Sequence, residues 1–167
     1  MAIEFPDGTQ LVITRTVSRS PERVFEAFTD SEQMARWIWG PNAPGAEVVC
    51  DARVGGRWSA YMDAPEGESQ QWPGEKHGMR GVFAVVDRPE RIVYTLNWDA
   101  PVGYNVGVDP STLTDEAVVI DFKPSGEGTI IAFRHLGIPD DGVSVHEHAK
   151  GVDATLDTLE QLLGSGG

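Results

Sequence analysis

The sequence predicts an α+β domain in which a curved antiparallel sheet of about six or seven strands wraps around one long C-terminal helix. Three observations indicate this fold. Six strand-like segments lie between residues 48 and 135, the segment 144–163 has the spacing of an amphipathic helix, and two short helical segments follow the first strand. Because no internal repeat or linker interrupts this order, we expect one domain over residues 1–167, with its core at about 10–163 and a flexible tail at 164–167.

The first strand and two short helices are expected near the N-terminus. Residues 11–17 are rich in β-branched side chains, which favour a strand. Ser20 can cap a helix that begins with Pro21, because a serine hydroxyl accepts a backbone hydrogen bond and proline needs no donor in the first turn. Ser31 is the predicted cap of the second helix. A strand therefore leads into two helices before the main part of the sheet.

The rest of the sheet is predicted from short apolar or alternating segments that glycine, proline and aspartate clusters separate. These segments are residues 48–51, 57–62, 79–86, 91–98, 117–122 and 129–135. Gly55 and Gly56 favour a hairpin between the first two of them. Residues 63–76 and 100–114 hold prolines, glycines and polar side chains without a period, so we expect two long loops there. Loops of this kind often flank the mouth of a pocket.

The C-terminal helix is the clearest single element. Apolar side chains recur at alternating spacings of four and three, which is typical of a helix with one buried face, at Val145, Ala149, Val152, Leu156, Leu159 and Leu163. About 20 residues at ~1.5 Å each span ~30 Å, which is enough to cross the concave face of a curved sheet.

Charge and composition exclude several classes of partner. The chain has 26 acidic and 13 basic residues, and its formal net charge of -13 repels nucleic-acid phosphates and anionic lipids alike. The N-terminus lacks the basic-then-apolar pattern of a signal peptide, and no apolar run has the length of a membrane span. We therefore expect a cytoplasmic protein without nucleic-acid or membrane partners. The one cysteine, Cys50, excludes an internal disulfide.

Several segments together resemble a known family. SRSPERVFEAFTD at 18–30 resembles its first helix, MARW at 34–37 its second, and VGGRW at 54–58 a glycine-containing turn into the next strand. Further matching segments follow in the family's order at residues 81–83, 89–96, 133–140 and 156–163. On these residues the chain resembles the START-like, polyketide-cyclase (SRPBCC) superfamily, in the branch of the C-terminal domain of the activator of heat-shock-protein-90 ATPase.

The resemblance covers roughly residues 10–163 and implies a helix-grip fold, in which the sheet and the long helix enclose a cavity. Relatives include ligand carriers, cyclases, resistance proteins and chaperone regulators, so the resemblance implies a fold more firmly than a function. One departure lies in the last helix, where many relatives have Gly-Trp and this chain has Gly151 and Val152. The missing aromatic ring implies a roomier cavity.

Aromatic side chains are the main candidates for ligand contact. Ligand pockets are mostly apolar with a few polar groups, and tryptophan and tyrosine offer both. Core filling is the competing interpretation of each ring taken singly. His135 alternates with apolar residues and His77 begins a strand, so both are candidate polar groups of the pocket. The predicted ligand-binding set is Trp37, Trp58, Tyr61, His77, Tyr94, Trp98, His135, Val152 and Leu156.

The sequence predicts no metal site and no cofactor. His146 and His148 lie ~200° apart around a helix, which prevents them from sharing an ion. The i, i+4 histidine spacing of helical zinc sites is absent, and one cysteine cannot complete a thiolate set. Gly55 and Gly56 lack the lysine and the spacing of a phosphate-binding loop, and no nucleophile-elbow serine occurs.

Binding is therefore favoured over catalysis. The leading hypothesis is the binding of a small hydrophobic or aromatic molecule in a cavity between the sheet and the C-terminal helix. Two alternatives stay open. One is a cyclase or dehydratase that uses His135 or a neighbouring acid in the same cavity, and the other is an interaction module that regulates a chaperone ATPase. No catalytic residue is assigned. Exposed strand edges would also allow a homodimer.

Overall fold

The computed structural model describes residues 1–41, 46–63, 76–99 and 116–165. Within these residues, eight strands form one sheet in the order β1-β2-β8-β7-β6-β5-β4-β3, and every neighbouring pair is antiparallel. The elements are β1 (Ala2–Glu4), β2 (Gln10–Val17), α1 (Pro21–Thr29), α2 (Ser31–Ala35), β3 (Glu47–Cys50), β4 (Arg57–Asp63), β5 (Lys76–Asp87), β6 (Arg91–Asp99), β7 (Glu116–Ser125), β8 (Gly128–Leu136) and α3 (Ser144–Ser165).

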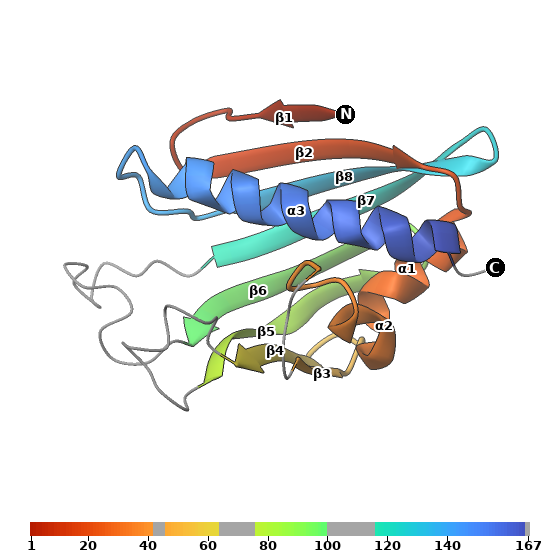
Figure 1. Cartoon of the computed structure of the whole chain (residues 1–167), viewed down its shortest axis with the longest axis horizontal. Coiled ribbons are helices and arrows are strands. Elements are labelled where there is room, and N and C mark those ends of the chain that lie inside the picture. Colours follow the sequence, from red (N-terminus) through yellow and green to blue (C-terminus); the bar gives the residue numbers. More distant parts are fainter. Residues whose placement is uncertain (42–45, 64–75, 100–115, 166–167) are drawn as a thin grey trace.

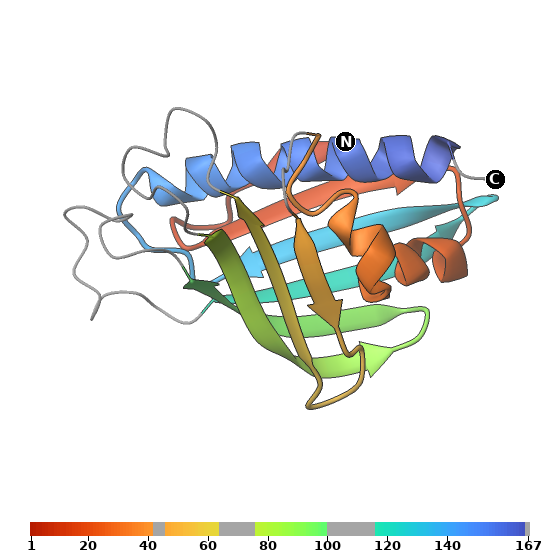
Figure 2. The ribbon, with the colours of Figure 1, turned by 60° about the horizontal axis from the view of Figure 1, so that its bottom comes forward.

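The sheet curves around the long helix. Figure 1 shows α3 lying along the part of the sheet formed by β2, β8 and β7, with α1 and α2 near the C-terminal end of α3. Figure 2 shows β3, β4 and β5 rising out of the plane of the other strands, so that the concave face of the sheet turns toward α3. The predicted α+β helix-grip fold is therefore confirmed. No helix in the described ranges is both long and apolar enough to span a bilayer.

One strand, β1, is absent from the sequence-based prediction. All three of its residues are exposed, so no alternation of apolar and polar side chains marks it. It pairs with β2, from Ala2 opposite Thr14 to Glu4 opposite Val12, and forms one edge of the sheet. Whether such an edge forms the homodimer that the sequence would allow is untested by the fold. At the other end of the chain, α3 continues to Ser165, two residues beyond its predicted end.

Local capping sets the start of the two short helices. Ser20 caps α1, as predicted. The cap of α2 is Asp30 rather than Ser31, because the aspartate carboxylate accepts a hydrogen bond from the Gln33 amide at 2.9 Å. The predicted cap was wrong by one residue, since aspartate and serine suit this position equally well. The Ser31 hydroxyl instead accepts from the Cys50 amide at 3.0 Å, which ties α2 to β3.

The core lies between the concave face of the sheet and the helices. Alternate residues of β2, β7 and β8 point inward and are buried. The largest fully buried side chains are Phe25, Phe83, Phe122, Leu11, Ile13, Ile92, Ile120, Ile131, Ile138, Leu156, Leu159 and Leu163. Ionisable residues share this inner face: Arg15 and Glu116 are 3% exposed, and His135 is 2% exposed. A buried ionisable group is costly unless it is paired, so the partners of these three residues are the first place to look for a functional site.

Most of the two predicted long loops lies outside the described residues. Residues 64–75 fall between β4 and β5, and residues 100–115 fall between β6 and β7. The expectation that these loops flank the mouth of a pocket therefore stays a prediction.

Candidate functional site

Three ionisable side chains meet on the inner face of the sheet beneath the first half of α3. Glu116 is the first residue of β7, His135 precedes the last residue of β8, and His148 lies in the second turn of α3. Strand alternation turns Glu116 and His135 inward, on the same faces as the buried Val118 and Phe133. We call Glu116, His135 and His148 the His–Glu cluster.

The three side chains of the cluster are in close contact. His148 Nε2 lies 3.0 Å from Glu116 Oε1, and His135 Nε2 lies 3.4 Å from Glu116 Oε2. The two imidazole rings meet edge to face, with their centroids 4.9 Å apart. The side chains of Glu116 and His135 are 4% and 3% exposed, whereas that of His148 is 16% exposed. Solvent therefore reaches the cluster at His148.

Two further contacts orient the cluster. Trp98 Nε1 donates a hydrogen bond to Glu116 Oε2 at 2.7 Å. His148 Nδ1 lies 2.7 Å from the carbonyl oxygen of Ser144, and because a carbonyl only accepts, this nitrogen carries the hydrogen. His135 differs, since neither of its ring nitrogens has a hydrogen-bond partner among the described residues. Its 3.4 Å contact with Glu116 lacks the geometry of a hydrogen bond.

Burial and mutual contact set the ionisation of the cluster. Burial raises the pKa of Glu116, but the contacts with His135 and His148 outweigh this effect and lower that pKa to about 2. Burial lowers the pKa of His135, and Glu116 offsets this only in part. Burial also acts to lower the pKa of His148, yet Glu116 and the Ser144 carbonyl raise it above its ordinary value. The cluster thus holds an anionic carboxylate, a neutral imidazole and a more basic imidazole.

An aromatic row, formed by Trp98, Tyr94 and Trp58, extends from the cluster across β6 toward β4. Trp98 lies edge to face with His148, with the ring centroids 6.0 Å apart. Tyr94, on the same face of β6, meets Trp58 edge to face at 4.9 Å. Gly81 of β5, which lies opposite Trp58, leaves room for the Trp58 indole, because a Cβ at position 81 would lie 2.6 Å from Trp58 Nε1. Tyr94 is half-buried and Trp98 is 37% exposed, so the row is accessible at the end next to the cluster.

The structure brings together only part of the predicted ligand-binding set. Trp37 packs against α1 instead: its ring lies edge to face with Phe28, with centroids 4.8 Å apart, and its Nε1 donates to the Ala27 carbonyl at 2.9 Å. Tyr61 lies on the outer face of β4, one residue from the inward and fully buried Ala60. The side chain of His77 is outside the described part of the molecule. The predicted residues on the inner face or on α3 above it are Trp58, Tyr94, Trp98, His135, Val152 and Leu156.

Sequence reasoning missed Glu116 and His148. Glu116 precedes the predicted strand 117–122, and its sequence position suggests the end of the preceding loop. Its two-residue spacing from the buried Val118 is the local signal that its side chain points inward. The prediction that His146 and His148 face apart is correct, since His146 is exposed and packs on Phe5 with ring centroids 4.8 Å apart. The carboxylate that His148 contacts lies 32 residues away, where helix spacing gives no information.

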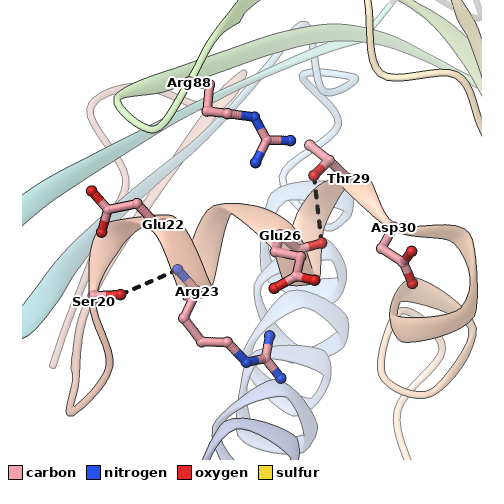
Figure 3. A pocket seen from close by; sticks show the side chains of 7 residues that line it. All are labelled: Ser20, Glu22, Arg23, Glu26, Thr29, Asp30 and Arg88. Atoms are coloured by element: carbon pink, nitrogen blue, oxygen red, sulfur yellow. Dashed lines mark hydrogen bonds between the residues drawn. The ribbon is translucent and has the colours of Figure 1, made fainter.

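A second candidate site is a surface depression of about 520 Å³ beside α1. Figure 3 shows its lining side chains: Ser20, Glu22, Arg23, Glu26, Thr29, Asp30 and Arg88. Several of these already have partners. Arg23 Nη1 donates to Gln33 Oε1 at 2.6 Å, Asp30 caps α2, and the Arg88 guanidinium lies over the Phe25 ring at 4.8 Å. Acidic and basic groups are mixed in this depression, so the His–Glu cluster is the stronger candidate.

The cluster and the aromatic row offer two kinds of chemistry side by side. The carboxylate and the imidazoles can hydrogen-bond a polar group, or their lone pairs can bind a metal ion. The aromatic row and the apolar inner face can pack a hydrophobic group. Together they suit an amphipathic small molecule better than a purely apolar one.

Comparisons with known proteins agree with this architecture. A family model described as activator of Hsp90 ATPase homolog 1-like protein matches residues 18–164. Among solved structures, protein CV1439 from Chromobacterium violaceum has 27% sequence identity and a TM-score of 0.72, over 93% of this chain and 97% of that chain.

Two more distant structures share the fold. Protein Ms6760 from Mycobacterium smegmatis is 22% identical with a TM-score of 0.76, over 100% of this chain and 98% of that one. PFC0360w from Plasmodium falciparum, described as an HSP90 activator, is 21% identical with a TM-score of 0.66, over 93% of this chain and 96% of that one. No curated protein matches the sequence.

Proposed function

The chain belongs to the family of activator of Hsp90 ATPase homolog 1-like proteins, and on this basis we propose that it binds one small apolar or aromatic molecule between the sheet and α3. The apolar part of that molecule packs against the aromatic row, and a polar group contacts the His–Glu cluster. The family supports a ligand-binding or Hsp90-activator-like module in general. The place and chemistry of the ligand are our proposal.

One observation carries the proposal: the exposure of Trp98 on the inner face of the sheet. Trp98 is 37% exposed, whereas Ile92 and Leu96 on the same face of β6 are 0% and 5% exposed. A large ring left accessible beside a buried polar cluster is typical of a ligand pocket rather than of a filled core. The hydrogen bond from Trp98 to Glu116 also fixes the ring before any ligand arrives.

The cluster limits the chemistry of the ligand. It contains one carboxylate and no lysine or arginine, and the chain has a formal net charge of -13. A strongly anionic molecule would therefore be repelled. The ring nitrogens can donate or accept hydrogen bonds according to their tautomer. We expect an uncharged or cationic molecule that carries a hydroxyl, carbonyl or amine beside its apolar part.

The experiment is native mass spectrometry of the gently purified chain, followed by titration with a panel of apolar and aromatic molecules under tryptophan fluorescence. We expect a retained molecule or saturable quenching. Calorimetry then compares variants: Trp98→Leu should weaken binding on the order of 10-fold, since one aromatic contact contributes about 1.5 kcal/mol.

Trp37→Phe is the matched control, because it alters a buried indole whose ring and hydrogen-bond contacts are with α1 rather than with the aromatic row. It should leave the affinity unchanged. A wild-type chain that responds to no member of the panel would contradict the proposal, and equal affinity in Trp98→Leu would remove Trp98 from the site.

The two alternatives make different predictions. A cyclase or dehydratase would convert the bound molecule, and His135→Ala would then reduce turnover. A chaperone-regulating module would stimulate an Hsp90 ATPase, in line with the description of the Plasmodium falciparum structure. We expect neither activity. Stimulation without any bound small molecule would replace the binding proposal by the interaction module.

A further inference from the structure

The donor atoms of the His–Glu cluster are those that transition-metal ions bind in proteins. Imidazole nitrogens and carboxylate oxygens make up three-residue zinc sites, in which a fourth position is left to water or another molecule. Here each donor comes from a different element: Glu116 from β7, His135 from β8 and His148 from α3. One donor atom from each residue lies within 4.8 Å of the other two.

The separations in the cluster are close to those that a bound ion imposes. Bonds of about 2.0–2.1 Å in a tetrahedral site place the donor atoms roughly 3.3 Å apart. The nitrogen–oxygen separations from Glu116 are 3.0 Å to His148 and 3.4 Å to His135. The two imidazole nitrogens lie within the same 4.8 Å limit.

The hydrogen bonding of His148 calls for a cation in the cluster. Its Nδ1 hydrogen is donated to the Ser144 carbonyl at 2.7 Å. A neutral imidazole has only one such hydrogen, so Nε2 then presents a lone pair to the Glu116 carboxylate at 3.0 Å. Two electron-rich atoms at this distance repel each other unless they share a positive charge. A proton or a metal ion can supply it.

His135 favours the metal ion over the proton. Its side chain is 3% exposed, and neither ring nitrogen has a hydrogen-bond partner within the described ranges. A buried polar atom without a partner is unfavourable. A proton shared by Glu116 and His148 would leave both nitrogens of His135 unsatisfied, whereas a metal ion at the centre of the cluster would bind one of them.

Two of the cluster side chains make the kind of second hydrogen bond that metal-binding residues usually make. Ligating histidines usually donate their second ring hydrogen to a carbonyl or carboxylate, and ligating carboxylates are themselves hydrogen-bonded. The Ser144 carbonyl serves His148 in this way, and the Trp98 indole donates to Glu116 at 2.7 Å. Two of the three ligands thus have an outer contact: Trp98 of β6 orients Glu116, and the Ser144 carbonyl orients His148.

We propose that Glu116, His135 and His148 bind one divalent transition-metal ion, for which Zn²⁺ is the reference. The sequence predicted no metal because His146 and His148 face apart, the i, i+4 histidine spacing is absent and there is one cysteine; these local signals carry no information about ligands from three separate elements. Mg²⁺ fits poorly, because it prefers oxygen ligands and two of the three donors are nitrogen. The site does not require the organic molecule proposed above, so the two proposals can fail separately.

The test is metal binding by the full chain after treatment with a chelator. Zn²⁺ binding is measured by isothermal titration calorimetry, and Co²⁺ serves as a visible-absorption probe of nitrogen and oxygen ligation. We expect one ion per chain, Co²⁺ bands that Zn²⁺ abolishes, and no comparable binding of Mg²⁺. His148→Ala should lower the Zn²⁺ affinity at least about 100-fold, because loss of an outer contact alone lowers it about 10–100-fold.

His146→Ala is the matched control, since it removes an exposed imidazole two positions earlier on the same helix. It should keep the wild-type affinity and stoichiometry. Glu116→Gln is a second variant that keeps the side-chain size and an acceptor for Trp98 but removes the anionic ligand; it should also weaken Zn²⁺ binding. Circular dichroism confirms that each variant is folded. Absence of Zn²⁺ binding by the wild-type chain, or equal losses in His146→Ala and His148→Ala, would overturn the proposal.

Discussion

The two halves of α3 meet buried ionisable groups of the sheet in different ways. The C-terminal half is held by Arg15 of β2, whose guanidinium contacts the carboxylates of Asp153, Asp157 and Glu160. The N-terminal half meets the His–Glu cluster through His148. Both arrangements place an ionisable side chain that is nearly inaccessible to solvent on the concave face of the sheet.

The two buried groups differ in how many of their nitrogens have hydrogen-bond partners. Both terminal amino groups of Arg15 are bonded: Nη1 donates to Asp157 at 2.6 Å and Nη2 to the backbone carbonyl of Asp153 at 3.0 Å. Only its buried Nε lacks a hydrogen-bond partner in the described ranges. Burial acts to lower the pKa of Arg15, but these acidic groups outweigh it and raise that pKa, so the charge is constant. His135 has no such bonds in the described chain. A buried charge with its partners in place stabilises a fold, whereas unpartnered donors are available to a ligand.

Arg15→Met should have the largest effect on stability. It removes the cation that faces three acidic side chains of α3 and leaves them to repel one another. Breaking a buried ion pair costs about 3–5 kcal/mol, and we expect about 3 kcal/mol in the free energy of unfolding because the carboxylates are 32%, 61% and 42% exposed. Urea unfolding measures this change.

Arg91→Met is the control for that measurement. The Arg91–Asp121 ion pair is also close, at 2.6 Å, but the Arg91 side chain is 52% exposed. Its loss should change the free energy of unfolding by less than about 1 kcal/mol. Equal decreases in the free energy of unfolding in the two variants would show that the buried ion pairs of Arg15 are no stronger than an exposed one.

Gly151→Ala should stabilise the helix between the two regions. Gly151 is exposed, and a Cβ at this position meets no atom within 4 Å. Alanine is about 0.8–1.0 kcal/mol more favourable than glycine inside a helix, so we expect the free energy of unfolding to rise by nearly that amount. Thermal and urea unfolding test it. A decrease would show that α3 needs the freedom of glycine at this point.

His135→Leu should change stability little, in contrast to Arg15→Met. The imidazole is buried without hydrogen-bond partners in the described structure, so an apolar side chain of similar size offsets most of the lost contact with Glu116, and we expect a net change of less than about 1 kcal/mol. Leucine cannot bind a metal ion, so the same variant should lose Zn²⁺ binding in calorimetry. A loss of about 2 kcal/mol or more in urea unfolding would identify His135 as a structural residue.

The smallest expected effect lies at the start of α3 and depends on pH. The hydroxyl and amide of Ser144, followed by the amide of Val143, lower the pKa of Asp141 from 3.8 to about 2. A carboxylate whose pKa is lower in the folded state stabilises the fold above the unfolded value and loses that contribution as the pH falls through the folded value. The exchange protection of the Ser144 amide should therefore decrease from pH 4 toward pH 2. Asp141→Asn should show no such decrease.

Much of the fold could be predicted from the residues alone. The spacing of Val145, Ala149 and Leu156 determines α3, and alternation determines most strands, because both periods are local properties of the chain. Alternation also places Tyr94 and Trp98 on one face of β6. The short exposed strand β1 has no such period and was not predicted.

The membership of the candidate site was decided only by the tertiary structure. Glu116 and His135 are neighbours because β7 pairs with β8 in the register that sets Val118 opposite His135. His148 joins them because α3 docks across that part of the sheet, 32 residues after Glu116 in the sequence. A periodic pattern states which side chains turn inward, but which of them meet depends on strand register and helix docking, and the packing of the whole molecule sets both.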